Sequence, residues 1–277
     1  MPKITVVEAN LLNKGDLDWG PLEQLGELTI HKKTRQKQLL KQCRDAEVIV
    51  VNKMIIDNEV MTHLPKLRLI CEAATGYNNI NLQAASDRQI PVCNVPDYGT
   101  LAVAQHTFAL LLELTNHVAL HSRKVHRGGW AKKRQWTYYQ RPLVELAGKT
   151  IGIIGYGRIG QAVAGIAQAY GMHTLVFHTH KVDDPEVVQV SWDELLQQSD
   201  ILSLHCPLTA DNQQMINARA FELMKTGAWL VNTARGGLID ETALVDALQT
   251  SKLGAAALDV LAQEPPSKSH PLYGMRN

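Results

Sequence analysis

Short runs of aliphatic and β-branched residues alternate along the chain with amphipathic stretches. In the first part of the chain, the apolar runs predict strands at residues 4–8, 48–52, 67–72 and 91–94. Two stretches between them, 36–43 and 58–64, have the spacing of amphipathic helices. Strands that alternate with helices are typical of a parallel sheet covered by helices, so the pattern predicts an α/β fold.

The same alternation begins again at Lys149. Apolar runs predict strands at residues 150–154, 173–177, 201–204, 228–232 and 255–260. The helices expected between them span residues 161–170, 192–198, 218–224 and 241–250. We therefore expect two Rossmann-like, doubly wound domains with parallel sheets, and 277 residues are enough for two such cores.

A long helical pattern at residues 101–127 joins the two series. Basic residues crowd its last turns and Gly128-Gly129 follow, which is typical of a helix end. The next segment is rich in aromatic residues, namely Trp130, Trp136, Tyr138 and Tyr139. We expect these side chains to pack against a second subunit, giving a homodimer through residues 101–145. The alternative use of the basic cluster at 123–134, a phosphate or nucleic-acid patch, is disfavoured because a helix end and a solvated loop explain it.

Composition narrows the possible partners. The formal net charge is +1, which provides no long-range field for nucleic acid or an anionic membrane. The most apolar long stretch, residues 101–120, carries polar groups that make it unsuitable as a membrane span. Four scattered cysteines without a CxxC pair are typical of reduced thiols. The sequence therefore predicts a soluble, cytoplasmic protein.

The segment Gly155-Tyr156-Gly157-Arg158-Ile159-Gly160 has the GxGxxG spacing of a dinucleotide-binding turn. A predicted strand precedes it and a predicted helix follows, which is the context that the motif requires. Gly155 would allow the tight turn, Gly157 would let the backbone approach a pyrophosphate, and Gly160 would let helix and strand pack closely. The helix N-terminus would then face the phosphates with unpaired N–H groups.

His178 occupies the position at the end of the next predicted strand, where an acidic residue would bind the adenosine ribose. Without a carboxylate, nothing there repels a 2′-phosphate, so the sequence leaves NAD and NADP both open as cofactors. A metal pair formed by His178 and His180 is the weaker interpretation, because two ligands do not make a site. No metal is expected.

Two charged residues follow predicted strands at the edge where ligands of open α/β sheets bind. Arg235 follows the strand at 228–232, and its fork suits a substrate carboxylate. Glu264 follows the strand at 255–260, and a carboxylate can orient a catalytic imidazole. A structural ion pair between the two is the alternative that spacing alone favours.

Several further motifs make the chain similar to a known protein family. The chain is similar over essentially its whole length to the D-isomer-specific 2-hydroxyacid dehydrogenases, and most of all to their glycerate dehydrogenase and hydroxypyruvate reductase branch. The motifs that carry the resemblance lie at residues 74–80, 98–100, 103–106, 152–160, 199–207 and 232–237.

The resemblance implies hydride transfer between a nicotinamide and a small 2-keto acid such as hydroxypyruvate or glyoxylate. It implies that the backbone at Gly76 and the Arg235 guanidinium hold the substrate carboxylate, with Met54 and Tyr77 beside it, and that Glu264 partners a general-acid histidine. The cofactor site would be lined by Val103, Cys206, Pro207, Thr233, Ala234 and Asp259. Residues 1–98 would form a flavodoxin-like substrate domain and residues 99–277 the dinucleotide-binding domain, with a cleft that closes on substrate.

The family's general-acid histidine is expected in a Pro-His pair beyond Asn277, after one more strand. His270 is expected in a loop and is not assigned this role. The sequence therefore predicts a C-terminally truncated dehydrogenase without the last strand of the cofactor domain or the helix that returns to the first domain. General acids contribute about 10²–10⁴-fold to rates, so we expect impaired turnover. The alternative is a dinucleotide-binding sensor or an inactive relative.

Overall fold

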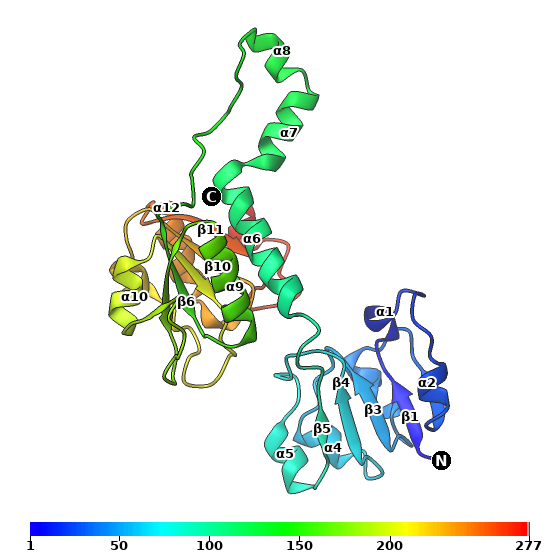
Figure 1. Cartoon of the computed structure of the whole chain (residues 1–277). Helices are drawn as coiled ribbons and strands as arrows, with labels where there is room; N and C mark the ends of the chain where they lie inside the picture. Colours follow the sequence, from blue (N-terminus) through cyan, green and yellow to red (C-terminus); the bar gives the residue numbers. More distant parts are fainter. Residues whose placement is uncertain (276) are drawn as a thin grey trace. The chain divides into compact units, whose positions relative to one another are not determined.

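The computed structural model describes residues 1–275 and 277. It divides into two compact units, Met1–Gly99 and Thr100–Asn277, each built around one parallel sheet with helices packed against it (Figure 1). The predicted α/β class with two Rossmann-like sheets is confirmed. The division falls one residue after the boundary expected from the sequence.

Unit 1 contains the sheet β2-β1-β3-β4-β5, in which every paired strand is parallel. This is the strand order of flavodoxin-like folds. The strands are β1 (Lys3–Val6), β2 (Glu27–Ile30), β3 (Val48–Val51), β4 (Leu69–Glu72) and β5 (Val92–Cys93). The helices are α1 (Ala9–Leu12), α2 (Gly20–Glu23), η1 (Gln36–Gln38), α3 (Leu39–Gln42), α4 (Asn58–Thr62) and α5 (Leu82–Asp87).

The core of unit 1 lies between the sheet and α3, α4 and α5. Alternate strand residues such as Ile49, Val51 and Ile70 are fully buried against these helices. The Asp57 and Asn81 side chains accept the N–H groups of Val60 and Ala84, so α4 and α5 each begin at a capped residue. On the opposite face of the sheet, residues such as Val48, Val50, Leu69 and Cys71 are only half-buried.

Unit 2 contains the sheet β11-β10-β9-β6-β7-β8, again with parallel pairs throughout. Counted from β6, this is the Rossmann strand order 3-2-1-4-5-6 in reverse. The strands are β6 (Thr150–Ile154), β7 (His173–Phe177), β8 (Val188–Gln189), β9 (Ile201–Leu204), β10 (Ala228–Asn232) and β11 (Leu253–Leu258).

Helices cover both faces of this second sheet. Helices α6 (Thr100–Asn116) and α9 (Arg158–Ala169) share one core with it, which includes Phe108, Val163 and Ile153. The opposite face packs on α10, α11 and α12 and includes Leu195 and Leu244. These helices and the two short 3-10 segments are α10 (Trp192–Gln198), α11 (Ala218–Leu223), η2 (Gly236–Leu238), α12 (Glu241–Gln249) and η3 (Pro271–Gly274).

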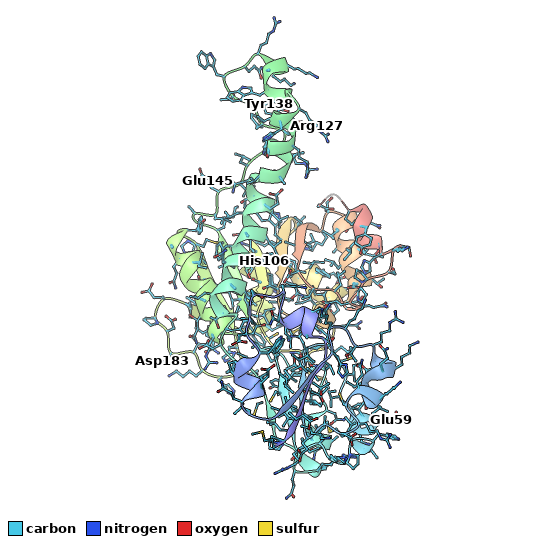
Figure 2. The ribbon with its side chains drawn as sticks, turned by 90° about the vertical axis from the view of Figure 1, so that its right-hand side faces the viewer. Glu59, His106, Arg127, Tyr138, Glu145 and Asp183 are labelled. Carbon is cyan, nitrogen blue, oxygen red and sulfur yellow. The ribbon has the colours of Figure 1, made fainter. Side chains whose placement is uncertain are left out.

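The single helix expected at residues 101–127 is wrong. The chain turns into the left-handed conformation at His117 (φ 49°), which ends α6 and starts α7 (Val118–His126). Glu113 explains how the break is tolerated, because its carboxylate accepts the Ala119 N–H at 3.0 Å and so caps the second helix. The arm continues through α8 (Gly129–Lys133) and carries Arg127 and Tyr138 away from the sheet of unit 2 before returning near Glu145 (Figure 2).

Candidate functional site

The predicted cofactor residues of unit 2 are gathered at the carboxyl edge of its sheet. They lie in the loops that follow β6, β7, β9, β10 and β11, with Val103 on the adjoining helix α6. Hydrogen bonds join successive strand ends: Gly155 N–H donates to the Phe177 carbonyl at 3.0 Å and His205 N–H to the Ile154 carbonyl at 2.8 Å. Ligands of open α/β sheets bind at this edge.

The glycine turn follows β6 and leads into α9, so the predicted strand–turn–helix order is confirmed. Gly155 has φ +91°, and a side chain on it would come within 2.7 Å of the Cys206 backbone nitrogen. Only glycine fits such a position. The turn thus lies against the end of β9, at the point between β6 and β9 where the strand order reverses.

The other two glycines of the turn differ in their surroundings. Gly157 is the N-cap of α9, and no atom lies within 4 Å of the place where its Cβ would be. A Cβ on Gly160 would overlap the Gly155 carbonyl oxygen, so this glycine allows α9 to pack tightly on the turn. Arg158 begins the helix and is exposed, whereas Ile159 is half-buried against the core. The open space above Gly157 faces a helix N-terminus, which favours an anion.

His178 lies directly beyond β7 and contacts the glycine turn. Its Nδ1 accepts the Tyr156 N–H at 3.3 Å, so in the neutral ring Nε2 carries the proton. The nearby acid Asp184 is engaged elsewhere, since its carboxylate accepts the Tyr156 hydroxyl at 2.6 Å. That bond holds the pKa of Asp184 below its usual range, while burial and Asp184 together raise the pKa of Tyr156. The sequence did not predict this pair.

The residues that directly follow β9 are uncharged near neutral pH. Burial raises the pKa of the Cys206 thiol to about 11 and lowers the pKa of His205 to about 4, so neither side chain is charged near neutral pH. Pro207 is held through its carbonyl, which accepts the Asn212 side chain at 2.8 Å. A buried, neutral thiol is a poor nucleophile, so Cys206 is suited to lining a site rather than to covalent chemistry.

The loop after β10 is shaped by Asn232, which is fully buried. Its side chain donates to the Arg235 carbonyl at 2.9 Å and accepts the Ala234 N–H at 3.0 Å. The Arg235 guanidinium donates through Nη1 to the Ala234 carbonyl at 2.7 Å. Asn232 thus fixes the backbone that presents Arg235.

Helix α6 is tied to the strand ends by two contacts that the sequence did not predict. Thr107, which hydrogen-bonds the Val103 carbonyl at 2.8 Å, lies with its hydroxyl 3.0 Å from that of Thr233. His106 Nε2 lies 3.2 Å from Asp259 Oδ1, beyond β11. The identity of these partners depends on how α6 packs across the sheet, which local sequence patterns do not report.

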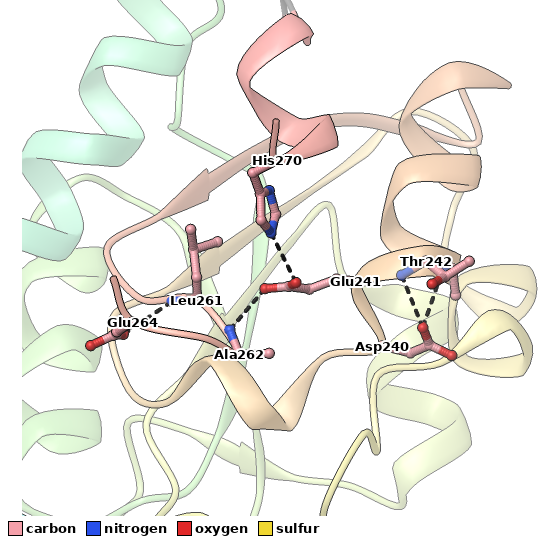
Figure 3. Close-up of polar contacts among 8 residues, drawn as sticks. Asp240, Glu241, Thr242, Leu261, Ala262, Glu264 and His270 are labelled. Atoms are coloured by element: carbon pink, nitrogen blue, oxygen red, sulfur yellow. Dashed lines mark hydrogen bonds and ion pairs between the residues drawn. The ribbon is translucent and has the colours of Figure 1, made fainter. Parts of the chain in front are cut away.

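Glu264 lies in the loop that joins β11 to the end of the chain. Its Oε1 accepts the Leu261 N–H at 3.1 Å, so the carboxylate stabilises its own loop (Figure 3). This loop packs directly on the Arg235 loop, because a Cβ on Gly236 would overlap the Leu261 backbone. The structure therefore brings the loops of the two predicted charged residues into contact.

His270 pairs with Glu241 rather than with Glu264. Its Nε2 lies 3.1 Å from Glu241 Oε2, and the other oxygen of Glu241 accepts the Ala262 N–H at 2.8 Å (Figure 3). Glu241 is the first residue of α12, where a negative charge is favoured by the helix dipole. The pair thus anchors both ends of the loop that carries Glu264.

The predicted substrate residues Met54, Gly76 and Tyr77 belong to unit 1, where they lie in the loops that follow β3 and β4. Met54 is half-buried and packs on the core, whereas Tyr77 is 46% exposed. Asn79 connects the two loops, because its side chain donates to the Met54 carbonyl at 3.0 Å and its own carbonyl accepts the Ile56 N–H at 2.8 Å.

Metal-ligand clusters and membrane-spanning helices are both absent from residues 1–275 and 277. No group of three or more His, Cys, Asp or Glu side chains with the arrangement of a metal site occurs among them. Within the same residues, no helix has both the length and the apolar character needed to cross a membrane.

A family model and a similar protein of known name both point to the same family. Residues 108–277 match the family model for the NAD binding domain of D-isomer specific 2-hydroxyacid dehydrogenases. The chain is 42% identical to a hydroxypyruvate reductase of Blautia hydrogenotrophica, over 99% of this chain and 87% of that protein.

Two solved structures are similar in fold and sequence. One is an acyclic imino acid reductase in complex with NADPH and D-Arg, with TM-score 0.88 and 29% identity over 99% of this chain and 86% of that one. The other is the D-lactate dehydrogenase of Aquifex aeolicus with NAD and lactic acid, with TM-score 0.84 and 32% identity over 94% of this chain and 78% of that one. The chain belongs to the D-isomer-specific 2-hydroxyacid dehydrogenase family.

Proposed function

We propose that the chain binds a nicotinamide dinucleotide along the carboxyl edge of the unit 2 sheet and reduces a small 2-keto acid such as hydroxypyruvate or glyoxylate. The observation that carries this proposal is the glycine turn at the reversal of strand order, with open space above Gly157 at a helix N-terminus. The family supports the reaction class, and the relative named hydroxypyruvate reductase supports the substrate class.

The cofactor, when bound, supplies or accepts the hydride. The N–H groups at the start of α9 would hold its pyrophosphate, and the uncharged loop at Cys206 and Pro207 would line the site beside it. Arg235 would bind the substrate carboxylate and polarise the neighbouring carbonyl. Glu264 has the chemistry to orient the imidazole of a general acid, and no histidine hydrogen-bonds to it among residues 1–275 and 277. His270 is not proposed as that general acid, because it pairs with Glu241.

The test combines a binding and a turnover measurement on the 277-residue chain. Binding of NADH and NADPH is followed by cofactor fluorescence, and hydroxypyruvate or glyoxylate is then added while cofactor oxidation is recorded. Binding followed by oxidation, with glycerate or glycolate as product, is the expected result. Binding without any oxidation would contradict the proposed reductase and favour a dinucleotide sensor.

One of the similar solved structures holds NADPH and the other holds NAD. We propose that His178 admits the 2′-phosphate of NADP. Replacing His178 with aspartate should shift the preference toward NADH by about 10–100-fold, because a carboxylate repels the phosphate by about 1.4–2.7 kcal/mol. The aspartate can still accept the Tyr156 N–H, so the turn keeps its hydrogen bond.

Affinities of the His178→Asp variant for NADH and NADPH measure this shift. The control is His173→Asp, an exposed position at the opposite end of β7. An unchanged ratio in the His178 variant would show that this position does not set cofactor choice.

We further propose that the protein is a homodimer formed through residues 101–145. The arm that carries α7 and α8 presents large apolar side chains to solvent, among them Trp136 at 98% and Tyr139 at 67% exposure. Exposed aromatic patches of this kind mark protein interfaces. Sedimentation equilibrium would give twice the mass of one chain if the proposal holds.

Because all four cysteines are free, we expect the protein in the cytoplasm.

A further inference from the structure

Two carboxyl groups are buried beneath the loops that carry Met54, Gly76 and Tyr77 in unit 1. Glu8 follows β1 and is 5% exposed, and Glu72 ends β4 and is 1% exposed. Buried acids need hydrogen-bond partners or a proton, since an unpaired charge in the interior is strongly unfavourable. The two groups meet this requirement in different ways.

Glu8 has a set of partners suited to a carboxylate. Its Oε2 accepts three successive backbone N–H groups, from Asn52 at 3.3 Å, Lys53 at 2.8 Å and Met54 at 3.0 Å. These three N–H donors give the buried Glu8 side chain the hydrogen bonds that a buried polar group needs. Glu8 therefore holds the loop that follows β3, including the backbone of Met54.

Glu72 has an incomplete set of partners. Its Oε2 accepts the Asn79 side chain at 2.8 Å, and the same Asn79 nitrogen donates to the Met54 carbonyl at 3.0 Å. Its Oε1 is buried and has no partner among the residues that the structure describes. A carboxylate with one unsolvated oxygen is costly, whereas a neutral carboxyl group is much less so.

The two charged groups near Glu72 shift its pKa in opposite directions. Burial raises its pKa to about 7, the Asn79 hydrogen bond opposes the shift, Glu8 raises the pKa further and Lys53 lowers it. Glu8 projects from the end of β1 and Lys53 from the loop after β3. Glu72 therefore loses its proton near neutral pH, and a second negative charge then appears beside Glu8.

We propose that Glu72 is a positioning residue that, in its neutral form and through Asn79, holds the loops after β3 and β4 in the arrangement that binds substrate. Loss of its proton places a second carboxylate beside the one that holds the Met54 backbone, and the two loops loosen. Substrate binding by Met54, Gly76 and Tyr77 is then weaker at higher pH. The substrate part of this inference rests on the proposed function.

The sign of the pH effect follows from linkage. The pKa of Glu72 is higher in the folded chain than the value of about 4.3 for an unfolded glutamate. Its contribution to stability is therefore fully present below about pH 4.3 and is lost as the pH rises through about 7. Glutamine, which cannot ionise, should remove this dependence.

The first measurement is amide hydrogen exchange of the loops at residues 52–56 and 73–80, with protection factors corrected for intrinsic exchange. Between about pH 6 and pH 8.5, protection in the wild-type chain should fall about 5–10-fold, whereas in Glu72→Gln it should stay constant. The matched control is Glu59→Gln, an exposed glutamate of α4 in the same unit (Figure 2). Equal pH dependence in Glu72→Gln and the wild type would overturn the proposal.

The second measurement is the steady-state KM for hydroxypyruvate over the same pH range. It should rise about 5–10-fold in the wild type and stay flat in Glu72→Gln, with little change in kcat. Glu72→Leu removes one of the two acceptors of the Asn79 amide, and it should raise KM about 10-fold at every pH. Loops that respond to pH while KM stays flat would overturn the substrate role. A lack of turnover in every variant would count against the proposed function alone, and the protection factors then decide whether Glu72 positions the loops.

Discussion

Replacement of Gly157 by aspartate is expected to remove dinucleotide binding while unit 2 keeps its fold. Gly157 has an ordinary φ of −79°, and no atom lies within 4 Å of a Cβ built on it. The folded protein can therefore accept the new side chain. The carboxylate would, however, occupy the space at the start of α9 where the pyrophosphate is proposed to bind, and would repel it.

The expected loss of affinity is about 100-fold or more, which corresponds to about 2.7 kcal/mol. Repulsion between two close charges reaches about 4 kcal/mol near a protein surface, so the expected loss of binding free energy is smaller than the repulsion could supply. Fluorescence titration with NADH and NADPH measures the affinity, and the thermal midpoint reports the fold.

The matched control is Gly165→Asp, which lies on the same helix and is also open and exposed. It carries the same substitution away from the turn, and its dinucleotide affinity should stay within about twofold of the wild-type value. If Gly157→Asp binds dinucleotide as well as Gly165→Asp does, the cofactor does not lie over the glycine turn.

Much of this site was accessible from the sequence because the chemistry is local. A β-rich run, three glycines at fixed spacing and an amphipathic helix occupy adjacent positions, and each constrains the backbone on its own. The parallel strands were predicted for the same reason, since their buried apolar runs are continuous. Two strands were missed: β2 is largely exposed, and β8 has two exposed residues. Each strand is short and has few apolar residues, Leu28 and Ile30 in β2 and Val188 in β8, so neither forms a long buried apolar run.

The rest of the arrangement depends on contacts between distant segments. The break at His117 is tolerated because of the Glu113 carboxylate, and nothing in the apolar periodicity of residues 101–127 reports that contact. Local patterns also give no sign of two other hydrogen bonds. Glu8 accepts a backbone N–H of the loop after β3, 45 positions away, and Glu241 pairs with His270, 29 positions away. Asn232 is an intermediate case: it lies within the motif that carries the resemblance, but its role in shaping the Arg235 loop required the structure.

Replacement of Arg235 by glutamine should have the largest effect on turnover of any change in unit 2. The Arg235 backbone is fixed by the buried Asn232 side chain, and its Nη1 is bound to the Ala234 carbonyl. A guanidinium held in this way presents its fork in one orientation, which is what bidentate recognition of a carboxylate requires. Glutamine is neutral and lacks the fork. We expect kcat/KM for hydroxypyruvate to fall about 10³-fold, or about 4 kcal/mol, while NADH affinity stays within about twofold.

The lysine variant separates charge from geometry at this position. Arg235→Lys keeps the positive charge but presents it as a point, so it should recover only part of the loss and remain about 10²-fold below wild type. Arg219→Gln removes an exposed arginine of α11 from the same unit and should leave kcat/KM unchanged. Full activity in Arg235→Lys would show that charge alone is sufficient. An equal loss of NADH affinity in Arg235→Gln would instead place the guanidinium in the cofactor site, so the two constants together decide what Arg235 binds.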